Sequence, residues 1–260
     1  MTWVSVGDTV GAAFNYPPLE KQAHCDRHGI FESKCYTGDV WTRCPQCEAE
    51  ASAAEDARKA DAEKAARLSA WRRKVDDAGI PPRFTEKHLQ NFIADTPRKQ
   101  EALAFAQDYA DDWAAVLQSG RCAMFVGRCG TGKTHLAAGI GLRVMNRHGA
   151  TVLFTTTLRA IRRIKDSWRK GGETESEAVK ALVTPDLLIL DEIGVQFGSE
   201  TEQLILFDVL NERYEKRKPC ILISNLPVAD VKAYLGERIT DRLREDGGAF
   251  VPFDWESFRG

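Results

Sequence analysis

The chain has 260 residues, of which 43% are hydrophobic, and its formal net charge is −2. This length suits one large domain with a smaller one, and the near-neutral charge excludes a protein that binds polyanions over its whole surface. The first 18 residues lack the pattern of a secretory signal, and no apolar run reaches membrane-spanning length. We therefore expect a cytoplasmic protein without a membrane partner.

The first 50 residues are rich in cysteine and poor in large apolar residues. Two short pairs separated by 15 residues suit a tetrahedral zinc with three thiolates and one imidazole. A segment with so little core needs a metal to fold, although free thiols in a loose segment are an alternative. Cys35 is left over, and His24 is an alternative ligand with poorer spacing. The predicted zinc ligands are Cys25, His28, Cys44 and Cys47.

Residues 48–78 contain Ala, Glu, Lys and Arg but no Gly or Pro, which predicts a charged helix. Its apolar residues gather only near the end, and Gly79 with the following prolines stops it. We therefore predict a zinc-binding domain over 1–50, a helical linker over 51–78 and an α/β domain over 79–260.

The stretch "GRCGTGKTH" (127–135) fits G-x-x-x-x-G-K-T and lies between an apolar run and a helical pattern. Its glycines let backbone N–H groups approach a phosphate, and the helix N-terminus adds a favourable dipole. Lys133 can reach the β- and γ-phosphates, and Thr134 can offer its hydroxyl to Mg²⁺. The predicted nucleotide-binding residues are Gly127, Gly130, Thr131, Gly132, Lys133, Thr134 and His135.

The next chemical signal is "PDLLILDEIG" (185–194), which predicts a strand buried on both faces and ending in two carboxylates. Asp191 is the candidate Mg²⁺ ligand, and Glu192 is placed to polarise an attacking water. One strand, "TVLFTT" (151–156), and a helix over 157–170 fit between the two motifs. A further strand, "CILISNL" (220–226), ends in Ser224 and Asn225, where a polar side chain can hydrogen-bond the γ-phosphate or position the water, and Asn225 is the candidate residue.

Two basic segments have both a structural and a functional interpretation. In 158–172, apolar residues at helical spacing favour a core stripe with a solvated basic face, whereas the cations and Trp168 also suit single-stranded DNA. Lys165 and Trp168 are the candidate DNA contacts. In "LGERITDRLRE" (235–245), an arginine cluster is either a solvated face or part of a nucleotide site.

The order of these motifs resembles that of AAA+ ATPases and, more narrowly, of DnaC-type bacterial replicative helicase loaders. The matching pieces are "GIPPRF" (79–84), "GRCGTGKTHLAAGI" (127–140), "LLILDEIGVQ" (187–196), "LISN" (222–225), "LGERITDRLRE" (235–245) and "FDWESFR" (253–259). The resemblance covers residues 79–260. It implies a P-loop NTPase domain with a parallel five-stranded sheet. The sequence after Arg244 shows no long helical lid of the kind found in larger AAA+ proteins.

The resemblance also implies a function and further site residues. Such loaders bind ATP and Mg²⁺, assemble into a ring or spiral, hydrolyse ATP weakly with DNA stimulation, and place a hexameric DnaB-type helicase on single-stranded DNA. Arg238 matches the arginine that reaches a neighbour's γ-phosphate, and Ser199 matches a DNA-facing position. The N-terminal region of such loaders grips the helicase, and here it resembles the zinc-bearing N-termini of some of them.

Three alternatives differ in partner or chemistry. An IstB-type helper of a DNA transposase shares the ATPase motifs. A small-molecule P-loop kinase needs an acceptor pocket, whereas Glu192 beside Asp191 favours water activation. A zinc-dependent nucleic-acid-binding regulator would use ATP only structurally.

Overall fold

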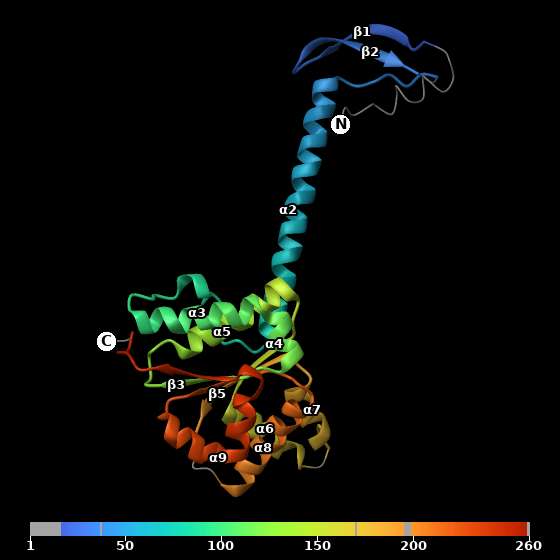
Figure 1. Cartoon of the computed structure of the whole chain (residues 1–260). Helices are drawn as coiled ribbons and strands as arrows, with labels where there is room; N and C mark the ends of the chain where they lie inside the picture. Colours follow the sequence, from blue (N-terminus) through green and yellow to red (C-terminus); the bar gives the residue numbers. More distant parts are fainter. Residues whose placement is uncertain (1–16, 37, 170, 195–198, 259–260) are drawn as a thin grey trace. The chain divides into compact units, whose positions relative to one another are not determined.

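The computed structural model of the chain describes residues 17–36, 38–169, 171–194 and 199–258 (Figure 1). Of the sequence features above, Lys170, Arg259 and the last residues of the "DEIGVQ" stretch lie outside these residues. The chain divides into two compact units, Met1–Trp71 and Arg72–Gly260.

The described part of the first unit is a β-hairpin followed by a long helix. Strands β1 (Leu19–Cys25) and β2 (Gly29–Cys35) pair antiparallel, with Cys25 opposite Gly29 at the turn. The helix α2 (Pro45–Asp77) begins three residues before the predicted start, because Pro is well tolerated at the first helical position. The predicted boundary at residue 50 therefore falls inside α2, and residues 48–70 are all exposed.

The second unit is built on a five-stranded sheet in which every pairing is parallel, which confirms the predicted fold class. The strands are β3 (Ala123–Gly127), β4 (Val152–Thr156), β5 (Leu187–Ile193), β6 (Cys220–Ser224) and β7 (Ala249–Phe253), in the order β4-β5-β6-β3-β7. Only the first four had been located in the sequence. The fifth, β7, pairs with β3 at one edge of the sheet.

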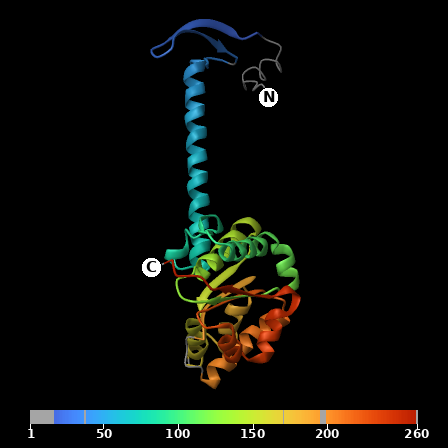
Figure 2. The same cartoon turned by 60° about the vertical axis from the view of Figure 1, so that its left-hand side comes forward.

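Helices cover both faces of this sheet (Figures 1 and 2). One face carries α3 (Pro97–Asp111), continued by α4 (Trp113–Ser119), and α5 (Lys133–His148). The other carries α6 (Thr157–Ser167), α7 (Glu175–Val183), α8 (Glu200–Glu215) and α9 (Val228–Arg244). Because both faces are covered, successive residues of β5, such as Leu188 and Ile189, are both fully buried. Because the strands are parallel, their carboxyl ends and the loops that follow them lie at the same edge of the sheet.

Three short 3₁₀ segments, η1 (Pro82–Phe84), η2 (Leu89–Asn91) and η3 (Glu245–Gly247), complete the described secondary structure. After Arg244 the described residues contain only η3, β7 and a short tail, so this part of the chain forms no large helical lid, as expected. No helix among the described residues has both the length and the apolar character needed to cross a membrane.

One buried charge was missed in the sequence. Arg213 of α8 is fully buried, and its guanidinium donates to backbone carbonyls before β5 and β6 and to the sulfur of Cys220. Since a buried guanidinium needs every donor satisfied, this cage fixes α8 against the amino-terminal ends of the two strands. The accepting carbonyls belong to Leu182, Val183, Pro185, Asp186 and Pro219.

Candidate functional site

The predicted phosphate-binding loop lies between β3 and α5, at the carboxyl edge of the sheet. Gly130 and Gly132 have positive φ values of 78° and 92°, which side-chain-bearing residues rarely adopt. A Cβ on Gly132 would also come within 2.6 Å of the ring of Phe92. The loop therefore requires glycine at this position for both conformation and space.

Lys133 is the first residue of α5 and is almost completely buried within the loop. Its ammonium group donates to the carbonyl oxygens of Gly127 and Arg128, each at 2.7 Å. The charge is thus held beside the backbone that would surround a phosphate, which is where P-loop chemistry needs a lysine.

The two nucleotide motifs meet through a direct side-chain contact. The hydroxyl of Thr134 donates to one carboxylate oxygen of Asp191 at 3.0 Å, and the backbone N–H of Glu192 donates to the other at 2.7 Å. Burial raises the pKa of Asp191, against the effect of these two hydrogen bonds. A hydroxyl and a carboxylate oxygen this close together fit the hard oxygen ligands that Mg²⁺ prefers, so the donor set suits the predicted ion.

The carboxyl edge also carries the residues proposed for water activation. Glu192 has a φ of 64°, an unusual value for a residue other than glycine, and its side chain is exposed to the pocket. Asn225 lines the same pocket, whereas Ser224 is buried and donates to the carbonyl of Ile193 at 2.7 Å. Asn225, the predicted residue at the end of "CILISNL", therefore faces the site.

These elements enclose a cavity of about 660 Å³. Its second wall, which no pattern in the sequence predicts, comes from residues 83–93 and from Phe258. His135 links the two walls because its Nε2 donates to the carbonyl of His88 at 2.9 Å and lies equally close to Asn91. The stretch "GIPPRF" was a signal for this wall, but only as part of the resemblance. The cavity is lined by Arg83, Phe84, Lys87, Asn91, Phe92, Ile93, Cys129, Gly130, Gly132, Lys133, Thr134, His135, Asp191, Glu192, Asn225 and Phe258.

Arg238 does not line this cavity in its own chain. It lies on α9 with an exposed side chain, and its guanidinium carbon is 5.3 Å from the ring centre of Phe207. Arg242 lies one turn further along α9, with its guanidinium over Tyr214. Neither arginine contacts the phosphate-binding loop of its own subunit.

Two of the three candidate DNA residues come together at the start of α8. Lys165 pairs with Glu202 at 2.8 Å, and the hydroxyl of Ser199 caps α8 by accepting from the backbone N–H of Glu202. The helix α6 ends at Ser167, three residues earlier than predicted, so Trp168 lies just beyond it. Trp168 is 50% exposed and is not part of the core stripe, which includes Ala160, Ile161 and Ile164.

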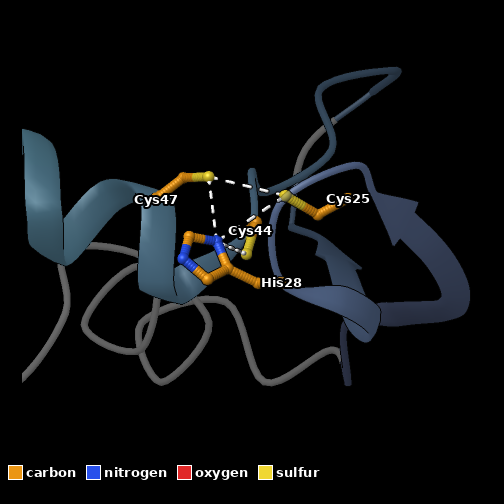
Figure 3. Close-up of side chains that lie close together, drawn as sticks. All are labelled: Cys25, His28, Cys44 and Cys47. Atoms are coloured by element: carbon orange, nitrogen blue, oxygen red, sulfur yellow. Dashed lines mark hydrogen bonds between the residues drawn. The ribbon is translucent and has the colours of Figure 1, made fainter.

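In the first unit, the four predicted zinc ligands converge (Figure 3). Their ligand atoms all lie within 4.8 Å of one another. Nδ1 of His28 is 3.3 Å from the sulfur of Cys47 and 3.6 Å from that of Cys44, and the sulfurs of Cys25 and Cys47 are 3.5 Å apart. Tetrahedral zinc, with bonds of about 2.3 Å to sulfur and about 2.0 Å to nitrogen, places its ligand atoms about 3.5–3.8 Å apart. The donor set therefore fits zinc in kind and in spacing.

The surroundings of the cluster favour a bound cation. Backbone N–H groups of Arg27 and His28 lower the pKa of the Cys25 thiol to about 6, whereas the hydrogen bond with Cys25 raises the pKa of the Cys47 thiol to about 11. Cys25 therefore ionises readily, and a bound metal would displace the proton of Cys47. The other ring nitrogen of His28 bonds to a carboxylate oxygen of Glu50 at 3.0 Å, an arrangement that orients metal-binding imidazoles.

The spare residues lie elsewhere. Cys35 donates to the carbonyl of Gly38, and His24 is exposed beside Asp26. In the described part of this unit the only buried residues are Ser33, Cys35 and Cys44. Since this is too small a core to hold a fold, the cluster is the main candidate for its stabilisation.

Comparison with known proteins gives concordant matches. Residues 109–257, more than half of the chain, match the family described as IstB-like ATP binding protein. The replicative helicase loader DnaC of Escherichia coli (strain K12) is 31% identical over 202 residues, which cover 78% of this chain and 81% of that protein. DnaC of Buchnera aphidicola subsp. Schizaphis graminum is 30% identical over 183 residues, or 70% of this chain and 73% of that protein.

Solved structures agree on the fold. A crystal structure of the DnaC helicase loader superimposes with a TM-score of 0.60 at 22% identity, covering 66% of this chain and 99% of that one.

Proposed function

Because the chain belongs to the DnaC-type branch of the IstB-like ATP-binding proteins, we propose that it is an ATP-dependent loader of a hexameric, DnaB-type replicative helicase. The observation that carries the proposal is the contact between Thr134 and Asp191, which joins both nucleotide motifs in one cavity of a chain similar to a loader over most of its length. Loading onto single-stranded DNA at the initiation of replication, in the cytoplasm, is part of this proposal.

ATP is bound with its phosphates in the loop 127–134. The N–H groups of the loop and the ammonium of Lys133 neutralise the β- and γ-phosphates, while Thr134 and Asp191 hold Mg²⁺. When bound, the ion would neutralise negative charge on the phosphates. Glu192 accepts a proton from the attacking water, and the amide of Asn225 orients this water or the γ-phosphate. Loss of the Lys133 ammonium in Lys133→Ala should abolish productive ATP binding in a titration, while Glu192→Gln should bind ATP and hydrolyse it slowly.

Hydrolysis is weak in the isolated subunit because Arg238 acts on the nucleotide of a neighbour. Its absence from the lining of its own cavity, together with its exposure, supports this role. An arginine supplied in trans can contribute roughly 10³–10⁵ in rate. Lys133→Ala and Arg238→Ala subunits should therefore each be inactive alone and recover part of the activity when mixed. No recovery at any mixing ratio would contradict a role in trans.

Single-stranded DNA binds over the end of α6 and the start of α8. The exposed Trp168 offers a stacking surface, Lys165 a cation and Ser199 a hydroxyl, and DNA phosphates compete with Glu202 for Lys165. This placement supports DNA-stimulated hydrolysis, because Ser199 follows Glu192 closely in the sequence.

The first unit binds the helicase and is held in shape by zinc. Large apolar side chains on its surface, those of Leu19, Ile30 and Val40, are each at least two thirds exposed and support a protein-binding role.

A mixing experiment tests the proposal. The chain is combined with the host's replicative helicase, with and without ATP, and the products are measured by native mass spectrometry. We expect a complex that contains several copies of the chain per helicase hexamer and releases a helicase bound to single-stranded DNA. Binding to a transposase instead would favour the IstB-type function. A phosphorylated small-molecule product would favour a kinase, and full function of Glu192→Gln would favour a regulator with structural ATP.

A further inference from the structure

The last described residues of the chain return to the phosphate-binding loop. Phe253, at the end of β7, pairs with Gly127 at the start of the loop. Beyond it, the indole N–H of Trp255 donates to the carbonyl of Thr131 at 3.0 Å, and the backbone N–H of Phe258 donates to the carbonyl of Gly130 at 2.9 Å. Two successive peptide groups of the loop are therefore held by the segment 254–258, which we name the tail.

These two bonds fix the direction of the loop's N–H groups. In a trans peptide the carbonyl and the N–H of the following residue point in opposite directions, and the described residues contain no cis peptide. With the carbonyls of Gly130 and Thr131 turned toward the tail, the N–H groups of Thr131 and Gly132 are directed away from it. Backbone N–H groups at this position of a P-loop are the ones that bind phosphate.

The tail is itself anchored on the domain. Asp254 pairs with Arg98 of α3 at 3.1 Å, and the rings of Trp255 and Phe253 lie 4.9 Å apart. The ring of Phe258 packs edge-on against Phe92 at 5.7 Å, so that it closes the side of the cavity next to Gly132. These contacts do not depend on the nucleotide, so the tail can order the loop before any ligand arrives.

We infer that the tail positions the phosphate-binding loop, with Trp255 and Phe258 as positioning residues for the β-phosphate of the nucleotide. Glycines give the loop rotational freedom at Gly130 and Gly132, and each peptide that must turn before binding lowers the apparent affinity. The tail removes this cost by holding both peptides in the binding orientation. The inference rests on the nucleotide-binding part of the proposed function.

The experiment separates phosphate positioning from general stability. Trp255→Phe keeps an aromatic ring but removes the N–H donor, and Trp255 does not line the cavity. A chain ending at Ser257 removes the other donor. The matched control is Tyr109→Phe, since the hydroxyl of Tyr109 also donates to a backbone carbonyl, that of Arg121 at 2.7 Å, but away from the loop. Affinities for ADP and AMP are measured by calorimetry, and melting is followed without nucleotide.

We expect Trp255→Phe to weaken ADP binding about three- to tenfold, the effect of one hydrogen bond, and to leave AMP binding within about twofold. The chain ending at Ser257 should lower the ratio of ADP to AMP affinity in the same way. Tyr109→Phe should lower the melting temperature and leave this ratio unchanged.

Two results would overturn the inference. One is wild-type ADP affinity in both tail variants, and the other is an equal loss of ADP and AMP affinity, which would make the tail a support of the whole fold. If the unaltered chain binds ADP no better than AMP, the nucleotide site of the proposed function fails instead, and that outcome is visible before any variant is compared.

Discussion

Replacing Asp191 by Asn should stabilise the protein and remove its magnesium-dependent nucleotide binding. The raised pKa of Asp191 indicates that the substitution increases the free energy of unfolding. It means that burial disfavours the carboxylate more than the hydrogen bonds from Glu192 and Thr134 favour it. Asn can keep both bonds, with its oxygen accepting from the Glu192 N–H and its amide donating to the Thr134 hydroxyl. The variant loses the buried charge and keeps the contacts.

The expected gain is about 0.5–2 kcal/mol in the free energy of unfolding, the range seen when a functional site gives up a costly group. The pH dependence gives a second check. The folded state holds the proton of Asp191 more tightly than the unfolded state, whose pKa is near 3.8. The cost of the charge is therefore fully present at neutral pH and disappears as the pH falls through the folded pKa toward 3.8. The advantage of the variant should shrink over the same range.

The assay is urea unfolding of both proteins with and without Mg²⁺ and ATP. At a ligand concentration about 100 times the dissociation constant, binding stabilises the wild type by about 2.7 kcal/mol, and a tenfold loss of affinity would leave about 1.4 kcal/mol. We expect the variant to be more stable than the wild type without ligand and to gain less from ligand.

Asp186, at the opposite end of β5, is a matched control, because its pKa is shifted in the opposite direction and its substitution should have the opposite effect on stability. Burial opposes its ionisation, but hydrogen bonds from Lys218 and Thr151 outweigh it and lower its pKa. Asp186→Asn should therefore destabilise the chain by about 1 kcal/mol and leave ligand stabilisation intact. A less stable Asp191→Asn protein, or one that keeps its full gain from Mg²⁺ and ATP, would refute the reasoning.

Three further predictions concern other parts of the chain. Metal analysis should find one zinc per chain, and Cys44→Ser should lose it and unfold the first unit while the ATPase unit keeps its melting transition; retained zinc would contradict the ligand set. In a salt series of single-stranded DNA binding, Trp168→Ala should cost roughly 1–3 kcal/mol, and Lys165→Ala should lower the salt slope by about one counterion. Melting temperatures should hardly change, since Trp168 is half exposed; unchanged binding in both would move the DNA site elsewhere. Arg213→Met should destabilise the chain by about 3–5 kcal/mol in urea unfolding, because buried carbonyls lose their donor, and ADP affinity per folded molecule should not change. A loss of less than about 1 kcal/mol in the free energy of unfolding would show that water replaces the guanidinium as the hydrogen-bond donor to these carbonyls.

Features that depend on residues close together in the sequence could be predicted from the sequence. The phosphate-binding loop, the carboxylates after β5 and the cysteine pairs each depend on residues a few positions apart, where the backbone geometry of a turn or strand end leaves few alternatives. The structure brings these groups together, with Thr134 against Asp191 and the four candidate zinc-ligand atoms in one cluster. The apolar runs likewise predicted four of the five strands.

Contacts between residues far apart in the sequence were known only from the tertiary structure. The indole of Trp255 reaches a carbonyl 124 residues away, and His135 meets a carbonyl 47 residues before it. The exposure of Trp168 depends on α6 ending one residue before it, and the caged charge of Arg213 depends on five carbonyls from two other segments. A residue's own type and neighbours do not encode such partners, because their proximity results from the packing of helices on a sheet that closes only when the whole unit has folded.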